Sequence, residues 1–376
     1  MITYNFLART SQGLIDTLNE ELHSLGFHDT QKTAGGVFFK TDWEGCYKAN
    51  LCLRTSSRVV LPIIDFTANN GDELYKKISL HDFTQYIDPN GTIAVDASIR
   101  ESPFRDQRYV AMKIKDAIVD QFRDKFGYRP NVDSNKPHLL IVANAIKHQM
   151  YISIDTSGEP LFKRGYRVEN VPAPVKEHCA AALIKMTKWD QSMAIVDPMC
   201  GSGTFLIEAA MMALNIAPGV LRTNFGFQKL KNFNQHTWKT LSGKIVDQEK
   251  ESLPFQFYGY DKHPKAVQAS QMNVEAAGLS HVIQINHAFI ENVIPPCSKG
   301  MIIVNPPYGE RLQDKIILRD VYSQIGKTLK SRFQGWRCWV LSGDKELIRY
   351  IALKSSQKYK IFNGPIECRF LKYDIH

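Results

Sequence analysis

From residue 176 onward, the chain alternates short apolar segments with longer amphipathic ones. The segments AIVDP, FQFYGYD, HVIQIN and KGMIIV are short enough for buried strands, whereas GTFLIEAAMMALNI and PKAVQASQMNVEAAG have the length and periodicity of helices. Apolar strands that alternate with helices are typical of a parallel sheet covered on both faces. The pattern therefore predicts a doubly wound α/β fold. The last segment, KYKIFNGPIECRFLKYDI, adds an antiparallel hairpin, which makes the sheet mixed.

The first 160 residues predict a different organisation, with two small α+β units. In the first unit the strand YNFLART precedes a helix over 11–26, with Ser11 as its N-cap and Gly26 as its C-cap. In the second, the strand TIAVDASI precedes a helix over 105–127, and two further strands follow. A connector over 159–178 comes next, because its prolines and charges would not extend a core element.

The composition excludes several classes of protein. The seven cysteines form no CxxC pair, so the sequence predicts neither a disulfide framework nor a zinc site and fits a reducing cytoplasm. We expect no membrane span and no signal peptide, because no run of 18 apolar residues occurs and the start lacks a basic segment before an apolar one. Residues 1–160 contain 18 Lys and Arg against 20 Asp and Glu, and the remainder contains 29 against 18. The positive excess in the C-terminal half permits a polyanionic partner without proving one.

A glycine-rich turn follows the first strand of the alternating region. In AIVDPMCGSGTFL, Gly201 and Gly203 allow a ligand to approach the backbone closely, and the N-terminus of the following helix favours polar or anionic groups. The third glycine of the GxGxxG pattern is absent, so the turn alone is equally compatible with a tight strand–helix connection. Asp197, at the end of the strand, favours the interpretation as a cofactor loop.

A second acid, Asp261, ends the next strand, YGYD. In a doubly wound fold, an acid at this place can accept hydrogen bonds from both hydroxyls of a ribose. Asp261 lies 64 residues after Asp197, which is too far for a compact dinucleotide-binding unit, so we expect an insertion over 215–244. The alternative role for Asp261 is to cap the helix that begins near Pro264, and both roles can hold together.

The strand KGMIIV ends in Asn305, two prolines and Tyr308. Two prolines cannot continue a strand and would by themselves indicate only a rigid turn. Methylation of an exocyclic amino group on a nucleobase is one reaction that such a rigid segment can serve. This amino group is a poor nucleophile, since its lone pair is delocalised into the ring. The side-chain oxygen of Asn305 and the carbonyl of Pro306, held rigid by Pro307, can accept hydrogen bonds from its two N–H groups and turn the lone pair toward a methyl donor. Tyr308 offers a face on which an extruded base can stack.

Together these segments resemble class I S-adenosylmethionine-dependent methyltransferases. DPMCGSGT is similar to their first motif, YGYD to their ribose-binding acid, and NPPYG to the catalytic motif of enzymes that methylate amino groups. The resemblance implies a Rossmann-like fold with a seven-stranded mixed sheet and a terminal antiparallel hairpin, S-adenosylmethionine as cofactor, and no metal ion. It implies that the catalytic residues are Asn305, Pro306, Pro307 and Tyr308. The implied cofactor-binding residues are Asp197, Pro198, Cys200, Gly201, Ser202, Gly203, Thr204, Asp261, Lys262, Ala288 and Asn305.

One position departs from the pattern of this family. Many relatives have an Asp after the third strand, near the adenine, where this chain has Asn286 and His287. We expect main-chain groups around Ala288, or Asn286, to supply the adenine contact, and His287 to be a loop residue without a role.

The N-terminal half indicates which amino group is methylated. RDQRYVAMKIKDAIVDQFR, ISIDTSGEPLFKRGYR and APVKEHCAAALI resemble THUMP-containing RNA methyltransferases, most of all the bacterial large-subunit ribosomal RNA guanine-N2 methyltransferases. The opening FLARTSQGLIDTLNEELHSLG resembles the ferredoxin-like module of that family. The resemblance covers nearly the whole chain. It implies a ferredoxin-like module over 1–54, a THUMP RNA-binding domain over 55–160 and a methyltransferase domain over 161–376.

Several arginines are candidates for RNA contact. Phe104 and Tyr109 lie among arginines that can hold phosphates while the aromatic rings stack on bases, although these arginines can equally be solvated charges at a helix start. Those in the connector can bind RNA or form ion pairs between domains. The candidates are Arg100, Arg105, Arg108, Arg164 and Arg167.

The sequence therefore predicts a cytoplasmic enzyme that methylates the N2 amino group of a guanosine in RNA, with 23S ribosomal RNA as the favoured target. Transfer RNA is the nearest alternative substrate. A DNA adenine-N6 methyltransferase and a non-catalytic RNA-binding or ribosome-assembly factor are the remaining alternatives. The expected partner is structured RNA, without a membrane, and the protein is expected to be a monomer or a homodimer.

Overall fold

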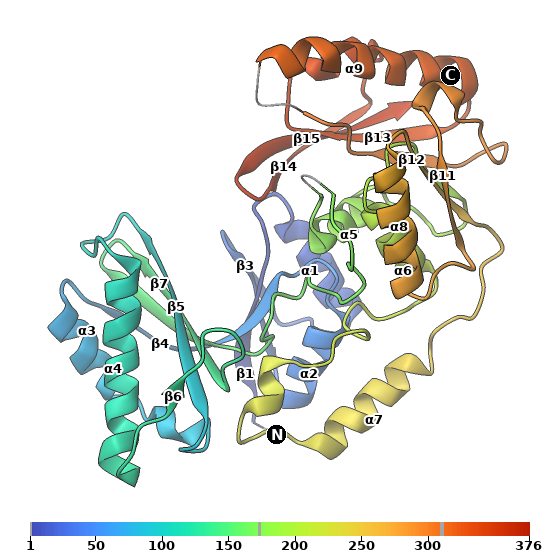
Figure 1. Ribbon diagram of the computed structural model, residues 1–376. Helices are drawn as coiled ribbons and strands as arrows, with labels where there is room; N and C mark the ends of the chain where they lie inside the picture. The colour runs from blue at the N-terminus through green and yellow to red at the C-terminus, as the bar shows by residue number, and fades with distance from the viewer. Residues whose placement is uncertain (1, 172–173, 309–311) are drawn as a thin grey trace.

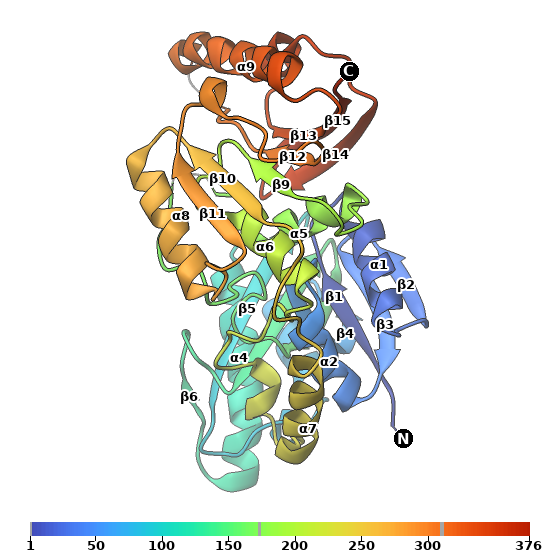
Figure 2. The same ribbon diagram turned by 90° about the vertical axis from the view of Figure 1, so that its right-hand side faces the viewer.

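The computed structural model describes residues 2–171, 174–308 and 312–376, which form two α/β parts, each around its own sheet (Figure 1). Turning the molecule by 90° shows the C-terminal part above the N-terminal part, with the connector between them (Figure 2). No helix in these described ranges is both long and apolar enough to cross a membrane.

One continuous sheet of eight strands runs through the N-terminal half, in the order β2-β3-β1-β4-β8-β7-β5-β6. The two predicted α+β units therefore share a single sheet. Strand β4 joins them, because it pairs antiparallel with β1 on one side and with β8 on the other. The strands are β1 (Tyr4–Arg9), β2 (Thr30–Thr33), β3 (Gly36–Thr41), β4 (Arg58–Thr67), β5 (Thr92–Arg100), β6 (Asn131–Val132), β7 (Leu139–Ile146) and β8 (Gln149–Asp155).

The helices of this half bury the apolar faces that their periodicity predicts. In α4 (Gln107–Phe126) the buried side chains include those of Val110, Ile114 and Phe122. Helix α1 begins at Ile15 with Leu14 at the N-cap position, so the expectation of an N-cap at Ser11 is wrong. The Ser11 carbonyl instead closes a turn with the Leu14 N–H at 3.1 Å. The helices are α1 (Ile15–Ser24), α2 (Trp43–Cys52), α3 (Gly71–Ser79), η1 (Phe83–Gln85) and α4.

The C-terminal sheet has seven strands in the order β11-β10-β9-β12-β13-β15-β14. The first five are parallel, and the terminal hairpin pairs antiparallel with β13, as the sequence predicts. Between β13 and β14 lies a short 3-10 segment, η4 (Leu347–Ile351). The strands are β9 (Ile195–Asp197), β10 (Phe257–Asp261), β11 (Ile283–His287), β12 (Met301–Val304), β13 (Arg337–Ser342), β14 (Gln357–Asn363) and β15 (Ile366–Asp374). The helices are α5 (Glu177–Met186), α6 (Thr204–Ala213), α8 (Pro264–Ala276), η3 (Ile290–Asn292) and α9 (Leu312–Arg332).

The insertion between α6 and β10 packs on the N-terminal half rather than on its own sheet. It contains η2 (Gly226–Lys229) and α7 (Gln235–Val246), and Figure 1 shows α7 beside α2. The ring of Phe227 stacks on that of Tyr47 with 4.5 Å between centroids, and Trp238 meets both rings edge-on. The insertion thus completes the hydrophobic core of the N-terminal half and fastens the two parts together.

We predict that Phe227→Ala destabilises the protein by about 3–5 kcal/mol, because it removes a ring that is fully buried in this shared core. Chemical denaturation followed by fluorescence and circular dichroism measures the loss. The exposed Lys239→Ala, on the same insertion, is the control and should shift the free energy of unfolding by less than about 0.5 kcal/mol. Equal stability of the two variants would show that the insertion does not support the core.

Candidate active site

The carboxyl ends of β9, β10, β11 and β12 meet at one edge of the C-terminal sheet, since these strands are parallel. In doubly wound folds this edge is where ligands bind. The predicted cofactor loop, the predicted ribose-binding acid and the Asn-Pro-Pro-Tyr segment all follow these strand ends. The fold therefore brings together, at one edge, residues that lie more than 100 positions apart in sequence.

The glycine-rich loop adopts a backbone that favours glycine at two positions. Gly201 has φ +55° and Gly203 has φ +78°, both in the left-handed region. The Gly203 N–H donates to the Cys200 carbonyl at 2.8 Å, and the Cys200 N–H donates to the Tyr260 carbonyl at 2.9 Å. The second of these bonds ties the loop to β10, beside Asp261.

The carboxylate of Asp261 organises this edge. It accepts a hydrogen bond from the Gly201 N–H at 3.1 Å and another from the His263 N–H at 2.9 Å. His263, not Asp261, occupies the N-cap position of α8, so Asp261 supports the start of this helix without being its N-cap residue. Each carboxylate oxygen keeps a lone pair for a further donor, which fits the ribose hydroxyls of a nucleoside cofactor.

Asp197 lies beneath the loop with its carboxyl group buried. The Met199 N–H donates to it at 3.1 Å. Burial raises the pKa of Asp197 to about 8, and the negative charge of Asp261 adds to the shift. Within the described residues its carboxylate forms no ion pair. Asp197 is therefore mainly protonated at neutral pH in the cofactor-free protein, and a cofactor that carries positive charge, as S-adenosylmethionine does, would favour its ionised form.

Arg167, from the connector, braces the loop from behind. Its guanidinium donates to the hydroxyls of Ser202 at 2.7 Å and Thr204 at 2.9 Å, and forms an ion pair with Glu177 at 2.7 Å. These two hydroxyls, which the sequence analysis assigned to the cofactor, also lie 3.0 Å from each other. In this structure they hold the shape of the loop.

The sequence analysis missed Asn273, a buried residue of α8. Its amide donates to the Ser202 carbonyl at 3.1 Å and accepts from the N–H groups of Val168 and Glu169. It therefore links the connector to the glycine-rich loop. An Asn within a predicted amphipathic helix gives no signal of this role in the sequence.

Asn305 follows β12 and carries a buried amide oxygen without a hydrogen-bond partner among the described residues. Buried polar atoms are nearly always hydrogen-bonded, so an orphaned acceptor at a sheet edge points to a donor supplied by a ligand. Pro306 is buried and Pro307 is exposed. The orphaned oxygen fits the amino N–H that the sequence analysis assigns to it.

Tyr308 packs toward the terminal hairpin. Asn363 donates to its hydroxyl at 3.4 Å, and its ring lies against Gly343, where an added Cβ would come within 2.8 Å of the ring. Burial raises the pKa of Tyr308 to about 12, so the phenol stays neutral at ordinary pH. The rest of the sequence motif, over 309–311, lies outside the described residues. A stacking role for Tyr308 stays a prediction.

The departure from the family pattern lies at the end of β11. The side chains of Lys262, Asn286 and His287 are exposed, and the His287 ring lies 2.9 Å from the Lys262 carbonyl. The Ala288 N–H donates to the Asp261 carbonyl at 3.1 Å. Neither Asn286 nor Ala288 is tested as an adenine contact, and both assignments stay predictions.

The predicted RNA contact at Arg164 is wrong, because its side chain is only 1% exposed. Its guanidinium pairs with Glu208 at 3.3 Å and donates to the carbonyls of Leu161 and Arg54. Arg167 likewise uses its donors inside the protein. Both ion-pair partners, Glu208 and Glu177, lie within 161–376, so the ion pairs do not cross between domains; only the bond from Arg164 to the carbonyl of Arg54 reaches the N-terminal half.

The three arginines around the start of α4 lie on the surface, where an RNA contact requires them. Arg100, Arg105 and Arg108 are exposed, and Tyr109 is 39% exposed. Phe104 is buried in the core, so the expectation that it stacks on a base is wrong. RNA binding by the three arginines stays a prediction.

Family comparisons agree with this architecture. Residues 164–372 match the family described as RMKL-like, methyltransferase domain, residues 68–155 match the THUMP domain, and residues 5–60 match the RlmL ferredoxin-like domain. The chain belongs to the RMKL-like methyltransferase family. The predicted resemblance and the predicted methyltransferase fold are thereby confirmed.

Individual relatives of this RMKL-like methyltransferase match over its whole length. It is 36% identical to the ribosomal RNA large subunit methyltransferase K/L of Syntrophotalea carbinolica over 98% of the chain, but spans about half (53%) of that longer protein. It is 35% identical to a Synechocystis protein named "Putative RNA methyltransferase" over 97% of that protein. The crystal structure of "SMU.472, a putative methyltransferase complexed with SAH" covers the whole chain with 30% identity and a TM-score of 0.91.

We predict that Arg167→Lys weakens binding of S-adenosylhomocysteine to this RMKL-like methyltransferase about tenfold. Lysine can keep the ion pair with Glu177 but cannot bridge both loop hydroxyls with a planar fork. Isothermal titration calorimetry measures the affinity. The exposed Arg332→Lys, at the end of α9, is the matched control and should bind like wild type. If both variants bind within twofold of wild type, the brace does not shape the cofactor loop.

We also predict a pH-dependent contribution of Asp197 to stability. Because its folded pKa is raised, its stabilising contribution is complete below pH about 4 and is lost as the pH rises to about 8. Asp197→Asn removes this dependence. The free energy of unfolding of the variant should therefore rise relative to wild type across this window, by up to about 1.4 kcal/mol per pH unit. Denaturant titrations of the cofactor-free protein measure it, and parallel pH profiles would contradict the assignment.

Proposed function

We propose that this chain transfers a methyl group from S-adenosylmethionine to the exocyclic N2 amino group of a guanosine in RNA, with 23S ribosomal RNA as the target. The observation that carries the proposal is the orphaned amide oxygen of Asn305, on the sheet edge that also holds the glycine-rich loop and Asp261. An acceptor held there suits an amino group better than a carbon or hydroxyl nucleophile, since only an amino group brings two N–H donors.

The cofactor supplies a methyl group bound to a sulfonium sulfur, and the thioether that remains is a good leaving group. The chain's own residues bind the cofactor and orient the amino group of the base. The carboxylate of Asp261 accepts hydrogen bonds from the ribose hydroxyls. The side-chain oxygen of Asn305 and the carbonyl of Pro306 accept hydrogen bonds from the two N–H groups of the base. With S-adenosylmethionine bound, this orientation would aim the nitrogen lone pair at the methyl carbon so that the new N–C bond could form as the S–C bond breaks, and the nitrogen would lose its proton to water afterwards. Positioning of this kind needs no dedicated general base.

The choice of RNA is supported by the THUMP match over 68–155 and by the name of the large-subunit ribosomal RNA relative. The choice of guanine-N2 rests on resemblance to that family. We propose a cytoplasmic protein that acts as a monomer or a homodimer. Transfer RNA and duplex DNA are the competing substrates, and the product nucleoside distinguishes them.

We predict that Asn305→Ala lowers the rate of methyl transfer at least about 100-fold, because an acceptor used in the transition state is lost. Its affinity for S-adenosylhomocysteine should stay within about threefold of wild type. The assay incubates the protein with labelled donor and unmodified 23S ribosomal RNA, and then identifies N2-methylguanosine after digestion to nucleosides.

The control for this variant is Asn292→Ala, an exposed asparagine of the same domain, which should transfer at the wild-type rate. Transfer by Asn305→Ala at that same rate would refute the catalytic role. Formation of N6-methyladenosine in place of N2-methylguanosine would refute the choice of base, and transfer only to transfer RNA would refute the choice of substrate.

A further inference from the structure

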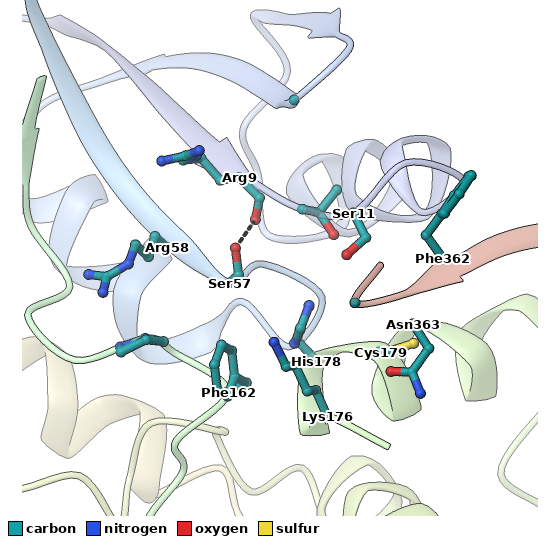
Figure 3. A pocket seen from close by; sticks show the side chains of 14 residues that line it. Arg9, Ser11, Ser57, Arg58, Phe162, Lys176, His178, Cys179, Phe362 and Asn363 are labelled. Carbon is teal, nitrogen blue, oxygen red and sulfur yellow. Dashed lines mark hydrogen bonds between the residues drawn. The ribbon is translucent and has the colours of Figure 1, made fainter. Parts of the chain in front are cut away.

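A cavity of about 350 Å³ lies where three parts of the chain meet (Figure 3). The N-terminal half contributes Arg9 at the end of β1 and Arg58 at the start of β4, the connector and the start of α5 contribute Phe162, Lys176 and His178, and the tip of the terminal hairpin contributes Phe362 to Gly364. Its volume falls within the range of ligand-binding pockets. The three parts belong to the N-terminal half, the connector and the methyltransferase domain, so only the assembled protein forms the cavity.

The charges that line the cavity favour an anion. None of the described residues that line it is acidic. Arg58 is compensated by Asp155, whereas the guanidinium of Arg9 forms no hydrogen bond or ion pair within the described ranges. Burial and then the charge of Arg58 lower the pKa of Arg9, although Asp155 and Asp96 act in the opposite direction. The ammonium of Lys176 lies over the Phe162 ring at 4.9 Å.

His178 independently indicates a ligand. Its residue is only 4% exposed, and its Nδ1 atom is buried without a hydrogen-bond partner among the described residues. Burial, together with the charges of Arg164 and Lys176, lowers the pKa of His178 to about 3, so the ring is neutral. A buried nitrogen that lacks a partner at the wall of a cavity is satisfied when a bound molecule completes its hydrogen bond.

The start of α5 adds to the preference for an anion. Lys176 occupies the N-cap position without a side-chain cap, and its neighbours His178 and Cys179 line the cavity. The helix dipole favours negative charge at such a terminus, although the Cys179 N–H already donates to the Lys176 carbonyl at 3.0 Å and Glu177 lies in the first turn. Two aromatic rings also line the cavity. The rings of Phe162 and Phe362 are both partly exposed and can stack on a base.

The cavity is adjacent to the segment that holds Asn305. Asn363, which lines the cavity, donates to the hydroxyl of Tyr308, three residues beyond Asn305. Figure 3 shows Asn363 and Phe362 on the side of the hairpin, with Arg9 and Arg58 on the opposite side. An RNA strand whose target base lies at Asn305 can therefore place the neighbouring nucleotide in this cavity.

We propose that this cavity binds one single-stranded nucleotide that flanks the target nucleotide in RNA, with its phosphate near Lys176 and His178 and its base against Phe162 or Phe362. The proposal rests on the proposed function, since it assumes an RNA substrate at Asn305. It assigns substrate selection in part to residues outside the THUMP domain. Single-stranded nucleotides, unlike paired ones, can be splayed into such a cavity.

The test compares Lys176→Ala and Phe362→Ala with Lys244→Ala, which removes one exposed positive charge from α7, far from the hairpin (Figures 1 and 2). The probe is unmodified 23S ribosomal RNA, used in filter binding and in methyl transfer. We expect both cavity variants to raise Kd and KM about tenfold, with kcat reduced less than threefold and with wild-type calorimetry for S-adenosylhomocysteine. Lys244→Ala should change Kd less than twofold. Thermal unfolding of each variant confirms that it is folded.

Cross-linking gives a second readout that does not depend on turnover. RNA that contains 4-thiouridine should cross-link to peptides that carry Phe162 or Phe362, and Phe362→Ala should lose the latter. Wild-type Kd and KM in both cavity variants, or cross-links confined to other regions, would overturn the proposal. If wild type binds and cross-links here but transfers no methyl group to RNA, the proposed function fails while the cavity assignment stands. If wild type binds no RNA, both fail.

Discussion

The buried ion pair between Arg164 and Glu208 connects every part of this molecule. The two side chains are 1% and 0% exposed, so each charge depends on the other and on the hydrogen bonds around it. Tyr166 donates to Glu208 at 3.0 Å, and Arg164 donates to the carbonyl of Arg54. Arg54 in turn donates to the carbonyl of Ile216, at the start of the insertion. Connector, α6, N-terminal half and insertion therefore share one network, and none can shift without leaving a charge or donor unsatisfied.

This fixed arrangement gives the functional edge its shape. The connector that supplies Arg164 to the network supplies Arg167 to the glycine-rich loop three residues later. The same connector and β1 form one side of the cavity near the terminal hairpin. Under the proposed function, the relative placement of the N-terminal half and the methyltransferase domain determines which part of an RNA can reach Asn305. Specificity would then come from the assembly as much as from the catalytic motif.

Much of the fold could be predicted because the signals are local. Apolar strands and amphipathic helices appear in the sequence as periodicity, and Asp261 and Asn305 stand at strand ends that any doubly wound fold gathers at one edge. Cap geometry was less predictable, since Ser11 precedes a turn that delays the helix to Ile15. The continuity of the N-terminal sheet was missed because nothing in the sequence of β4 shows that both of its edges are paired.

The sequence by itself determined the strand–helix alternation, the glycine-rich loop and the residues that end each strand, because these depend on neighbours a few positions away. Only the tertiary structure decided what surrounds each polar side chain. It buried Arg164 and Phe104, exposed Arg105 and Arg108, and left the Asn305 oxygen and His178 Nδ1 without hydrogen-bond partners among the residues that the structure describes. Burial and pairing arise from segments up to hundreds of residues apart, and a charge or amide in the sequence looks the same whether it later meets solvent, a partner or a ligand.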